Sequence, residues 1–195
     1  MIKLENVTKF YNSKGIITHA LKNINLELYK NEFVAICGPS GSGKSTLLNV
    51  ICKQDTFDEG EIYYKGNETA YFNVDDMDDF RKNKVGFIFQ NYNIIESYTV
   101  LQNVMLPYEL KGVPTKEAKK KALAIIDEVG LHDKINNRGA ELSGGQKQRC
   151  VIARALAFEP EILACDEPTG NLDSETGAEI MALIAKIAHD KLVLV

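Results

Sequence analysis

Residues 38–46 read Gly38-Pro39-Ser40-Gly41-Ser42-Gly43-Lys44-Ser45-Thr46, and this stretch decides the fold predicted for the chain. It matches the pattern G-x-x-x-x-G-K-[ST] and lies between an apolar run, Phe33–Cys37, and a run with helical spacing at Leu47, Leu48 and Ile51. A glycine turn between a buried strand and a helix is the context in which such a loop binds phosphate. Its backbone N–H groups point at the phosphate, and the helix N-terminus adds a partial positive charge.

The loop therefore predicts binding of a nucleoside triphosphate through Gly38 to Thr46. Lys44 is expected to reach the β- and γ-phosphates, and the Ser45 hydroxyl to hold Mg²⁺. The alternative is an ordinary Gly/Ser turn before a helix, which the matching strand and helix on either side disfavour.

A second element of the same site lies at Glu161-Ile162-Leu163-Ala164-Cys165-Asp166-Glu167, an apolar strand that ends in two carboxylates. Open α/β sheets bind ligands at the carboxyl ends of their strands. Asp166 is expected to hold Mg²⁺ through water, because that ion keeps much of its hydration shell. Glu167 is expected to orient and deprotonate the attacking water. The alternative is a solvent-exposed acidic pair at a strand end.

The third motif is Leu142-Ser143-Gly144-Gly145-Gln146-Lys147-Gln148-Arg149. At about 5% usage per residue type, its five letters LSGGQ arise by chance at roughly 3 × 10⁻⁷ per position. LSGGQ is the signature of the nucleotide-binding subunits of ATP-binding cassette (ABC) transporters, which the whole chain resembles. The resemblance implies that Ser143, Gly144, Gly145 and Gln146 contact ATP held by a partner subunit, at a helix N-terminus. A Ser N-cap before a helix over Gln146–Ala157 is compatible with that role.

The resemblance implies three further roles. Gln90 matches the Q-loop glutamine, which touches Mg²⁺ and the attacking water and senses the permease through Asn91–Ser97. Asp173 matches the D-loop aspartate, which links the two sites of a dimer. Tyr11 matches the aromatic residue that stacks on adenine; for Tyr11 alone, a surface or edge-strand tyrosine stays an alternative.

Composition and pattern place the chain among globular α/β proteins. Of its 195 residues, 45% are hydrophobic and 26% charged, and the net charge of -4 argues against a nucleic-acid binder. The longest apolar run, Ile180–Ala185, is far shorter than the ~20 residues that span a bilayer. Strands are expected at Ile2–Val7, Thr18–Leu28, Phe33–Cys37, Glu61–Tyr64, Thr69–Phe72, Val85–Phe89, Glu161–Cys165 and Leu192–Val195, and helices at 45–52, 75–84, Lys116–Val129, Gln146–Ala157 and Ser174–Ala188.

Alternating strands and helices predict a P-loop NTPase fold with a mostly parallel core sheet. The resemblance adds an antiparallel β subdomain and a helical subdomain inserted at 91–141, within one nucleotide-binding domain over 1–195. All four cysteines, Cys37, Cys52, Cys150 and Cys165, are expected to be buried and reduced. The three histidines, His19, His132 and His189, show no metal-ligand spacing and are expected to be structural or exposed.

The resemblance implies an ATPase that pairs with a second ABC subunit, most simply a second copy, around two Mg-ATP. Together they would drive an integral-membrane permease from the cytoplasmic face of the plasma membrane. The motifs at Asp166–Asp173 and Gly86–Gln90 are closest to the subgroup that exports macrolides or releases lipoproteins, whose members also serve antimicrobial-peptide resistance and cell division.

Other function classes fit less well. A non-transport ABC ATPase acting as a nucleotide-gated clamp would carry a long coiled coil or a second cassette. A small-molecule kinase does not need the signature, and Asn83-Lys84-Val85-Gly86 lacks the aspartate of a GTPase base-reading element. One family feature has no match: the switch histidine is expected one or two residues beyond the strand that Leu192–Val195 begins. We therefore expect a domain that ends before the switch histidine, and His189 does not match the position of that residue.

Overall fold

The computed structural model describes residues 1–187 and 190–195, and its strands form two separate sheets. The first sheet is antiparallel, with the order β2-β1-β4-β5. Its strands are β1 (Ile2–Ser13), β2 (Ile16–Leu28), β4 (Glu59–Tyr64) and β5 (Asn67–Glu68). The second sheet is parallel, with the order β3-β8-β7-β6. It contains β3 (Phe33–Val34), β6 (Val85–Ile88), β7 (Ile162–Cys165) and β8 (Leu192–Leu194).

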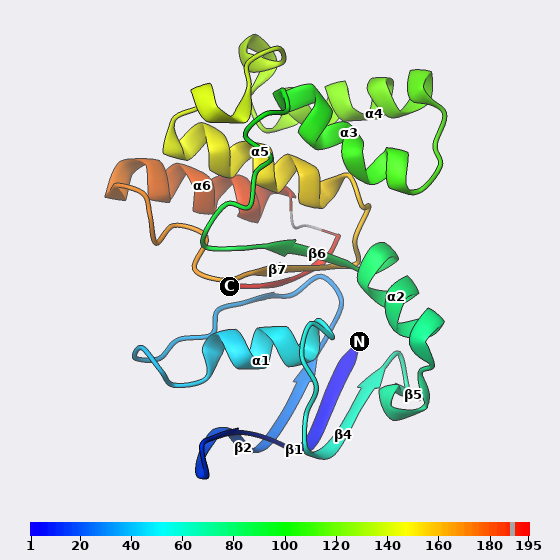
Figure 1. The fold of residues 1–195 in the computed structure, drawn as a ribbon, viewed down its shortest axis with the longest axis vertical. Helices are drawn as coiled ribbons and strands as arrows, with labels where there is room; N and C mark the ends of the chain where they lie inside the picture. The colour runs from blue at the N-terminus through cyan, green and yellow to red at the C-terminus, as the bar shows by residue number, and fades with distance from the viewer. Residues whose placement is uncertain (188–189) are drawn as a thin grey trace.

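The helices divide between the two faces of the parallel sheet (Figure 1). On one face, α1 (Lys44–Ile51) lies between the parallel and the antiparallel sheets. On the other face lie α3 (Val100–Leu110), α4 (Thr115–Glu128), α5 (Gly144–Leu156) and α6 (Ser174–Ile187). Helix α2 (Val74–Asn83) runs along the side, and short 3₁₀ helices span Thr69–Tyr71 (η1), His132–Lys134 (η2) and Gly139–Glu141 (η3).

Strand β7 shows why the sheet takes a helical layer on both faces. All four of its residues are buried, and successive side chains of a strand point to opposite faces. Ile162 and Ala164 accordingly join the core around α1, whereas Leu163 and Cys165 join the core around α5 and α6. A continuous apolar run is what a parallel strand covered on both faces requires.

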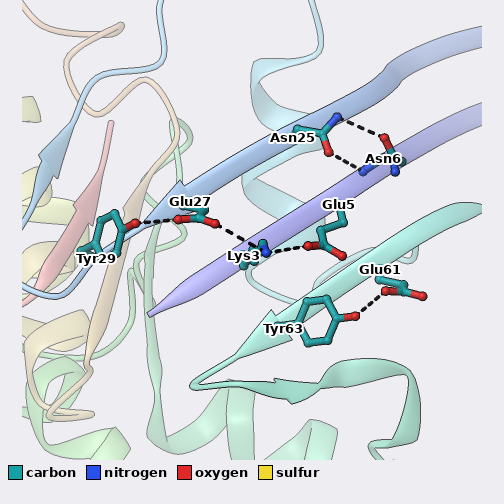
Figure 2. A network of polar contacts seen from close by, with 8 residues as sticks. All are labelled: Lys3, Glu5, Asn6, Asn25, Glu27, Tyr29, Glu61 and Tyr63. Atoms are coloured by element: carbon teal, nitrogen blue, oxygen red, sulfur yellow. Dashed lines mark hydrogen bonds and ion pairs between the residues drawn. The ribbon is translucent and has the colours of Figure 1, made fainter.

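The outer face of the antiparallel sheet is polar (Figure 2). Lys3 on β1 pairs with Glu5 at 2.6 Å and with Glu27 of β2 at 3.6 Å. Tyr29 donates a hydrogen bond to Glu27 at 2.6 Å, and Tyr63 donates one to Glu61. Such exposed pairs stabilise little, but they explain the polar alternation in β1 and β2. A cavity of about 540 Å³ beside this network contains none of the residues expected to bind nucleotide.

The predicted P-loop NTPase fold, with its parallel core sheet, is confirmed, but two strand predictions are wrong. Thr69–Phe72 does not form a strand: η1 occupies Thr69–Tyr71, because the buried Thr69 hydroxyl donates to the Ile62 carbonyl at 2.9 Å and turns the chain inward. The buried strand expected at Phe33–Cys37 lies at an edge of the sheet, and Phe33 is 44% exposed.

One cysteine prediction is wrong, because Cys37 lies beyond the end of β3, in the exposed segment that leads into the phosphate loop. Cys37 is exposed, whereas Cys52, Cys150 and Cys165 are buried and free as expected. The histidines were expected to be either structural or exposed, and His19 and His132 are exposed. Two predictions fall outside the described residues: the last residue of the helix expected at Ser174–Ala188, and the role of His189. Within the described part of the chain, no helix has the length and apolar character needed to cross a bilayer.

Candidate nucleotide-binding site

The phosphate loop connects β3 to α1, and its glycines have conformations that other residues rarely adopt. Gly41 has φ 79°, and Gly43, the N-cap of α1, has φ 95°. A Cβ atom on Gly43 would lie 2.3 Å from the carbonyl oxygen of Ala20 in β2. The loop therefore packs directly against the antiparallel sheet, and only glycine fits at this contact.

The Lys44 ammonium lies on the inner side of the loop. It donates hydrogen bonds to the carbonyl oxygens of Gly38 at 2.9 Å and Pro39 at 3.2 Å. An ammonium has three donors and carries a full charge, so this position suits it to bind a phosphate oxygen. The helix that Lys44 begins contributes the partial positive charge of its N-terminus.

The carboxylates at the end of β7 meet the loop. Ser45 donates to Asp166 Oδ1 at 2.8 Å, a contact between residues 121 positions apart. Gln90, which follows β6, donates to Glu167 Oε2 at 2.9 Å across 77 positions. Since β6 and β7 are adjacent parallel strands, their carboxyl ends lie at the same edge of the sheet. The structure thus gathers four of the predicted site residues beside Lys44.

Lys44, Ser45, Gln90 and Glu167 border a cavity of about 470 Å³. It is lined by Thr18, His19, Ala20, Ser40, Gly41, Gly43, Lys44, Ser45, Thr46, Gln90 and Glu167. The three β2 residues in this set were missed in the sequence, which carries no local signal for them: they reach the site only because β2 packs against Gly43. Asp166 lines a neighbouring cavity of about 430 Å³, together with Lys44 and Glu167.

Asn171 also contacts the site, and the sequence did not predict this contact. Its side-chain amide donates to the backbone carbonyl of Gln90 at 2.9 Å. This bond ties the segment after β7 to the segment after β6. It holds Gln90 in place through its backbone and leaves the side chain free to face Glu167.

Tyr11 on β1 lies outside the set that lines this cavity and is 44% exposed. Its hydroxyl donates to Asp55 Oδ2 at 2.7 Å, and this hydrogen bond is the main reason that the pKa of Tyr11 is raised. The buried Lys9 ammonium lies 5.1 Å from the Tyr11 ring centroid and 3.4 Å from Asp55 Oδ1. Neither Lys9 nor Asp55 was identified from the sequence, although both fix the orientation of this ring.

The signature residues form a helix cap. Ser143 is the N-cap of α5: its hydroxyl accepts from the Gln146 N–H at 3.4 Å, and the Gln146 side chain accepts from the Ser143 N–H at 3.0 Å. The helix begins at Gly144, two residues before the predicted start. None of residues 143–146 lines the cavity at the phosphate loop.

Asp173 caps the following helix. Its carboxylate accepts from the Thr176 N–H at 3.0 Å, and this backbone bond is the main cause of a lowered Asp173 pKa. The cap lies close to the signature: a Cβ atom on Gly145 would be 2.6 Å from Thr176 Cγ2. The structure therefore places the segments that contain Asp173 and Gly145 side by side.

The oxygen atoms beside the loop fit a hard cation. Ser45, Gln90 and Asp166 offer hydroxyl, amide and carboxylate oxygens, which are the ligands that Mg²⁺ takes. The described residues contain no group of three or more His, Cys, Asp and Glu side chains that could hold a metal ion. This small donor set fits an ion that is bound by one or two protein groups together with substrate phosphates.

A glycine loop between a strand and a helix, with a serine, a lysine and two strand-end carboxylates around two neighbouring cavities, defines a P-loop nucleotide-binding protein. The family model described as "ABC transporter" matches residues 21–170. The chain belongs to this family of ABC transporter ATP-binding domains.

The relatives found by sequence similarity agree with this assignment. MJ0796 of Methanocaldococcus jannaschii, named an ABC transporter ATP-binding protein, is 47% identical over 97% of this chain and 83% of its own length. The lipoprotein-releasing system ATP-binding protein LolD of Aquifex aeolicus is 43% identical over 96% of this chain and 82% of its own. The macrolide export ATP-binding/permease protein MacB of Nitrobacter winogradskyi is 42% identical over 97% of this chain and 30% of its own.

A dimeric structure of MJ0796 matches the fold with a TM-score of 0.88 and 44% identity, covering all of this chain and 87% of that one. A second MJ0796 dimer, in a post-hydrolysis state bound to ADP and Pi, matches with the same TM-score and 43% identity. The present chain is accordingly an ATP-binding cassette of the ATPase type.

Proposed function

We propose that this chain hydrolyses Mg-ATP at the edge of the parallel sheet and acts as one of two cassettes that drive a membrane permease. The observation that carries the proposal is the pair of long-range contacts at the phosphate loop, Ser45 to Asp166 and Gln90 to Glu167. They support the assignment of Ser45 and Asp166 as a cation-binding pair and of Gln90 and Glu167 as a water-binding pair.

Each group has a role in phosphoryl transfer, which depends on positioning and on charge stabilisation. Lys44 and the loop N–H groups hold the β- and γ-phosphates. Ser45, Asp166 and Gln90 would hold Mg²⁺, which when bound neutralises charge on the phosphate oxygens. Glu167 accepts the proton of the attacking water, and Gln90, hydrogen-bonded to Glu167, helps to orient that water.

The adenine base stacks on Tyr11 in this proposal. A flat aromatic ring offers stacking area but few base-specific contacts. The hydrogen bond to Asp55 and the nearby Lys9 ammonium restrain the ring before the nucleotide arrives. Binding then costs less side-chain entropy than it would with a free tyrosine.

A second copy completes the site. Ser143, Gly144, Gly145 and Gln146 do not line the phosphate-loop cavity of their own chain, so we assign them to ATP held by the partner, with C₂ symmetry. Asp173 lies beside the signature segment and would connect the two sites. The dimeric state of the MJ0796 cassette supports this arrangement.

The partner in the membrane is an integral-membrane permease, and the chain would lie peripherally on the cytoplasmic face of the plasma membrane. The segment after Gln90 and the helical elements within 91–141 would form the subdomain that contacts it. The similarity to LolD and MacB favours lipoprotein release or macrolide export as the process served. Antimicrobial-peptide resistance is a third process that the resemblance of the motifs implies. A nucleotide-gated clamp is less well supported, since no described helix exceeds 14 residues and a long coiled coil is thus not among them.

The test is steady-state phosphate release at saturating Mg-ATP. Glu167→Gln keeps the size of the side chain but removes the base, and the loss of one such group commonly lowers turnover by about 10²- to 10³-fold. Glu109→Gln, an exposed glutamate on α3, is the matched control and should not change the rate. Equal turnover of Glu167→Gln and the wild type would refute the proposed base.

A further inference from the structure

A separate cavity of about 400 Å³ lies among the end of α1, η1 and α2. It is lined by Lys53, Gln54, Asp55, Thr56, Phe57, Thr69, Ala70, Met77 and Arg81. None of these residues lines the phosphate-loop cavity. Asp55 contacts Tyr11, and the other lining residues have no role in the proposed nucleotide site, so the cavity needs its own explanation.

Lys53 places a charged group in the wall of this cavity. The residue is 7% exposed, and its ammonium donates to the Thr69 hydroxyl at 2.6 Å and lies 4.9 Å from the centroid of the Phe57 ring. The Thr69 hydroxyl in turn donates to the Ile62 carbonyl. An ammonium carries three donors, and the described residues supply one acceptor for them.

The carboxylates near Lys53 are committed to other cations. Asp55 binds Lys9 at 3.4 Å and accepts from Tyr11, and Asp78 pairs with Arg81. No described carboxylate lies within 4.0 Å of the Lys53 ammonium, although most buried charges in proteins are paired. Burial lowers the pKa of Lys53 to about 8, so the group still carries its charge at neutral pH.

The backbone adds a second observation. Lys53 follows the C-cap of α1 and has φ 57°, the left-handed conformation that glycine normally supplies at this point of a helix. A lysine here is strained, and strained residues concentrate at binding sites. Arg81, from α2, donates to the Lys53 carbonyl at 3.2 Å and so holds this conformation.

We propose that the cavity binds a small molecule with an anionic head, carboxylate or phosphate, on Lys53 and an apolar body against Phe57, Ala70 and Met77. The ammonium supplies charge-assisted hydrogen bonds to the head. Phe57, Ala70 and Met77 form the apolar part of the lining and polar residues form the rest, and small-molecule sites combine apolar surface with polar groups that orient the ligand. The lining of this cavity shares no residue with the phosphate-loop cavity, although Asp55 also accepts a hydrogen bond from Tyr11.

Benzoate and phenyl phosphate serve as probes, and benzamide is the neutral control of the same shape. Each is titrated into the ¹⁵N-labelled protein saturated with ADP, so that the phosphate loop is filled, and amide chemical shifts are followed. We expect at least one of the two anions to bind ten times more tightly than benzamide, with shifts confined to residues 53–57, 69–70 and 77–81. The anion that binds more tightly identifies the head group.

Two variants remove the ammonium. Lys53→Met keeps the length of the side chain, and Lys53→Gly also removes the backbone strain, so at least one folded variant is expected. Both should lose the anion's tenfold advantage, whereas Lys82→Met, an exposed lysine on the same α2 helix as Arg81, should keep it. The proposal is wrong if neither anion binds, if benzamide binds equally well, or if either Lys53 variant binds the anion like the wild type.

Discussion

At the scale of single residues, charge and steric fit decide what the site binds. Lys44 contributes a full positive charge, and the lining of the 470 Å³ cavity contains no other lysine or arginine. Its two hydrogen bonds go to carbonyl oxygens of an exposed loop. The fold therefore depends little on Lys44, and nucleotide affinity depends on it strongly.

We predict that Lys44→Ala weakens ATP binding at least tenfold, equivalent to about 1.4 kcal/mol, because a charge-assisted contact to phosphate is lost. Isothermal titration calorimetry measures the affinity. Lys119→Ala, an exposed lysine on α4, is the control and should bind ATP normally. Equal affinities of Lys44→Ala and the wild type would remove this lysine from the site.

Tyr11 yields a second prediction at this scale. Replacing an aromatic ring that stacks on a base costs about 1–3 kcal/mol, so Tyr11→Ala should weaken ATP binding at least fivefold. Tyr11→Phe keeps the ring and loses only the bond to Asp55, and its affinity should stay within about twofold of the wild type. Calorimetry with Tyr29→Ala, an exposed tyrosine on the outer sheet face, as control separates stacking from a general effect. A normal affinity of Tyr11→Ala would place adenine elsewhere.

At the scale of elements, one cap can serve both stability and function. Ser143 and Gln146 satisfy free N–H groups at the start of α5, and such caps contribute about 1 kcal/mol. Thr99 and Gln102 form the same capping box at the start of α3, away from the phosphate loop. The pair of helices allows the two roles to be separated.

We predict that Ser143→Asp retains the thermal stability of the wild type, because aspartate is an equally good N-cap, yet abolishes ATP turnover. Its negative charge would lie where the partner's γ-phosphate binds. Thr99→Ala should show the reverse, losing about 1 kcal/mol of stability with normal turnover per folded molecule. Thermal melting and phosphate release measure the two quantities; unimpaired turnover by Ser143→Asp would argue against a phosphate contact at the signature.

Glu161, immediately before β7, connects this strand to α2 and to β4. Its carboxylate is contacted by Lys84 at the end of α2, by Tyr64 at the end of β4 and by the adjacent Lys65. Burial alone would raise its pKa, but the hydrogen bonds from Lys65, Lys84 and Tyr64 outweigh burial and lower the pKa from 4.5 to about 2. A lowered folded-state pKa means that the stabilisation is complete above pH 4.5 and is lost as the pH falls toward 2.

We therefore predict that Glu161→Gln destabilises the protein at pH 7, by at most about 3 kcal/mol, and by much less at pH 3. Urea denaturation of both proteins at the two pH values gives the difference in the free energy of unfolding. A difference that does not shrink at pH 3 would mean that the Glu161 charge contributes nothing to stability.

At the scale of the whole molecule, the proposed site is divided between chains. Lys44 and Ser143 of one chain serve different ATP molecules, so a catalytically blocked cassette should accumulate as a closed pair. We predict that Glu167→Gln with Mg-ATP forms a dimer, detected by multi-angle light scattering, and that adding Ser143→Asp to this variant returns it to a monomer. A monomer at high concentrations of Glu167→Gln and ATP would contradict the divided site.

The sequence by itself determined the local features of this protein. The glycine loop, the strand-end carboxylates and the cap at Ser143 are encoded in short stretches, because each depends on conformations and hydrogen bonds within a few residues. Periodicity predicted most of the long helices and strands for the same reason. The family followed from three such motifs.

Only the tertiary structure determined which distant residues contact these motifs. Ser45 reaches Asp166, and Tyr11 reaches Asp55, across 121 and 44 positions. Cys37 is exposed because the chain leaves the sheet before it, and the turn at Thr69 depends on its bond to Ile62. The burial of Lys53 beside a cavity could not be predicted, because no local pattern in the sequence distinguishes this lysine from the others. These contacts arise from packing between distant segments, and a local pattern carries no information on which segments pack together.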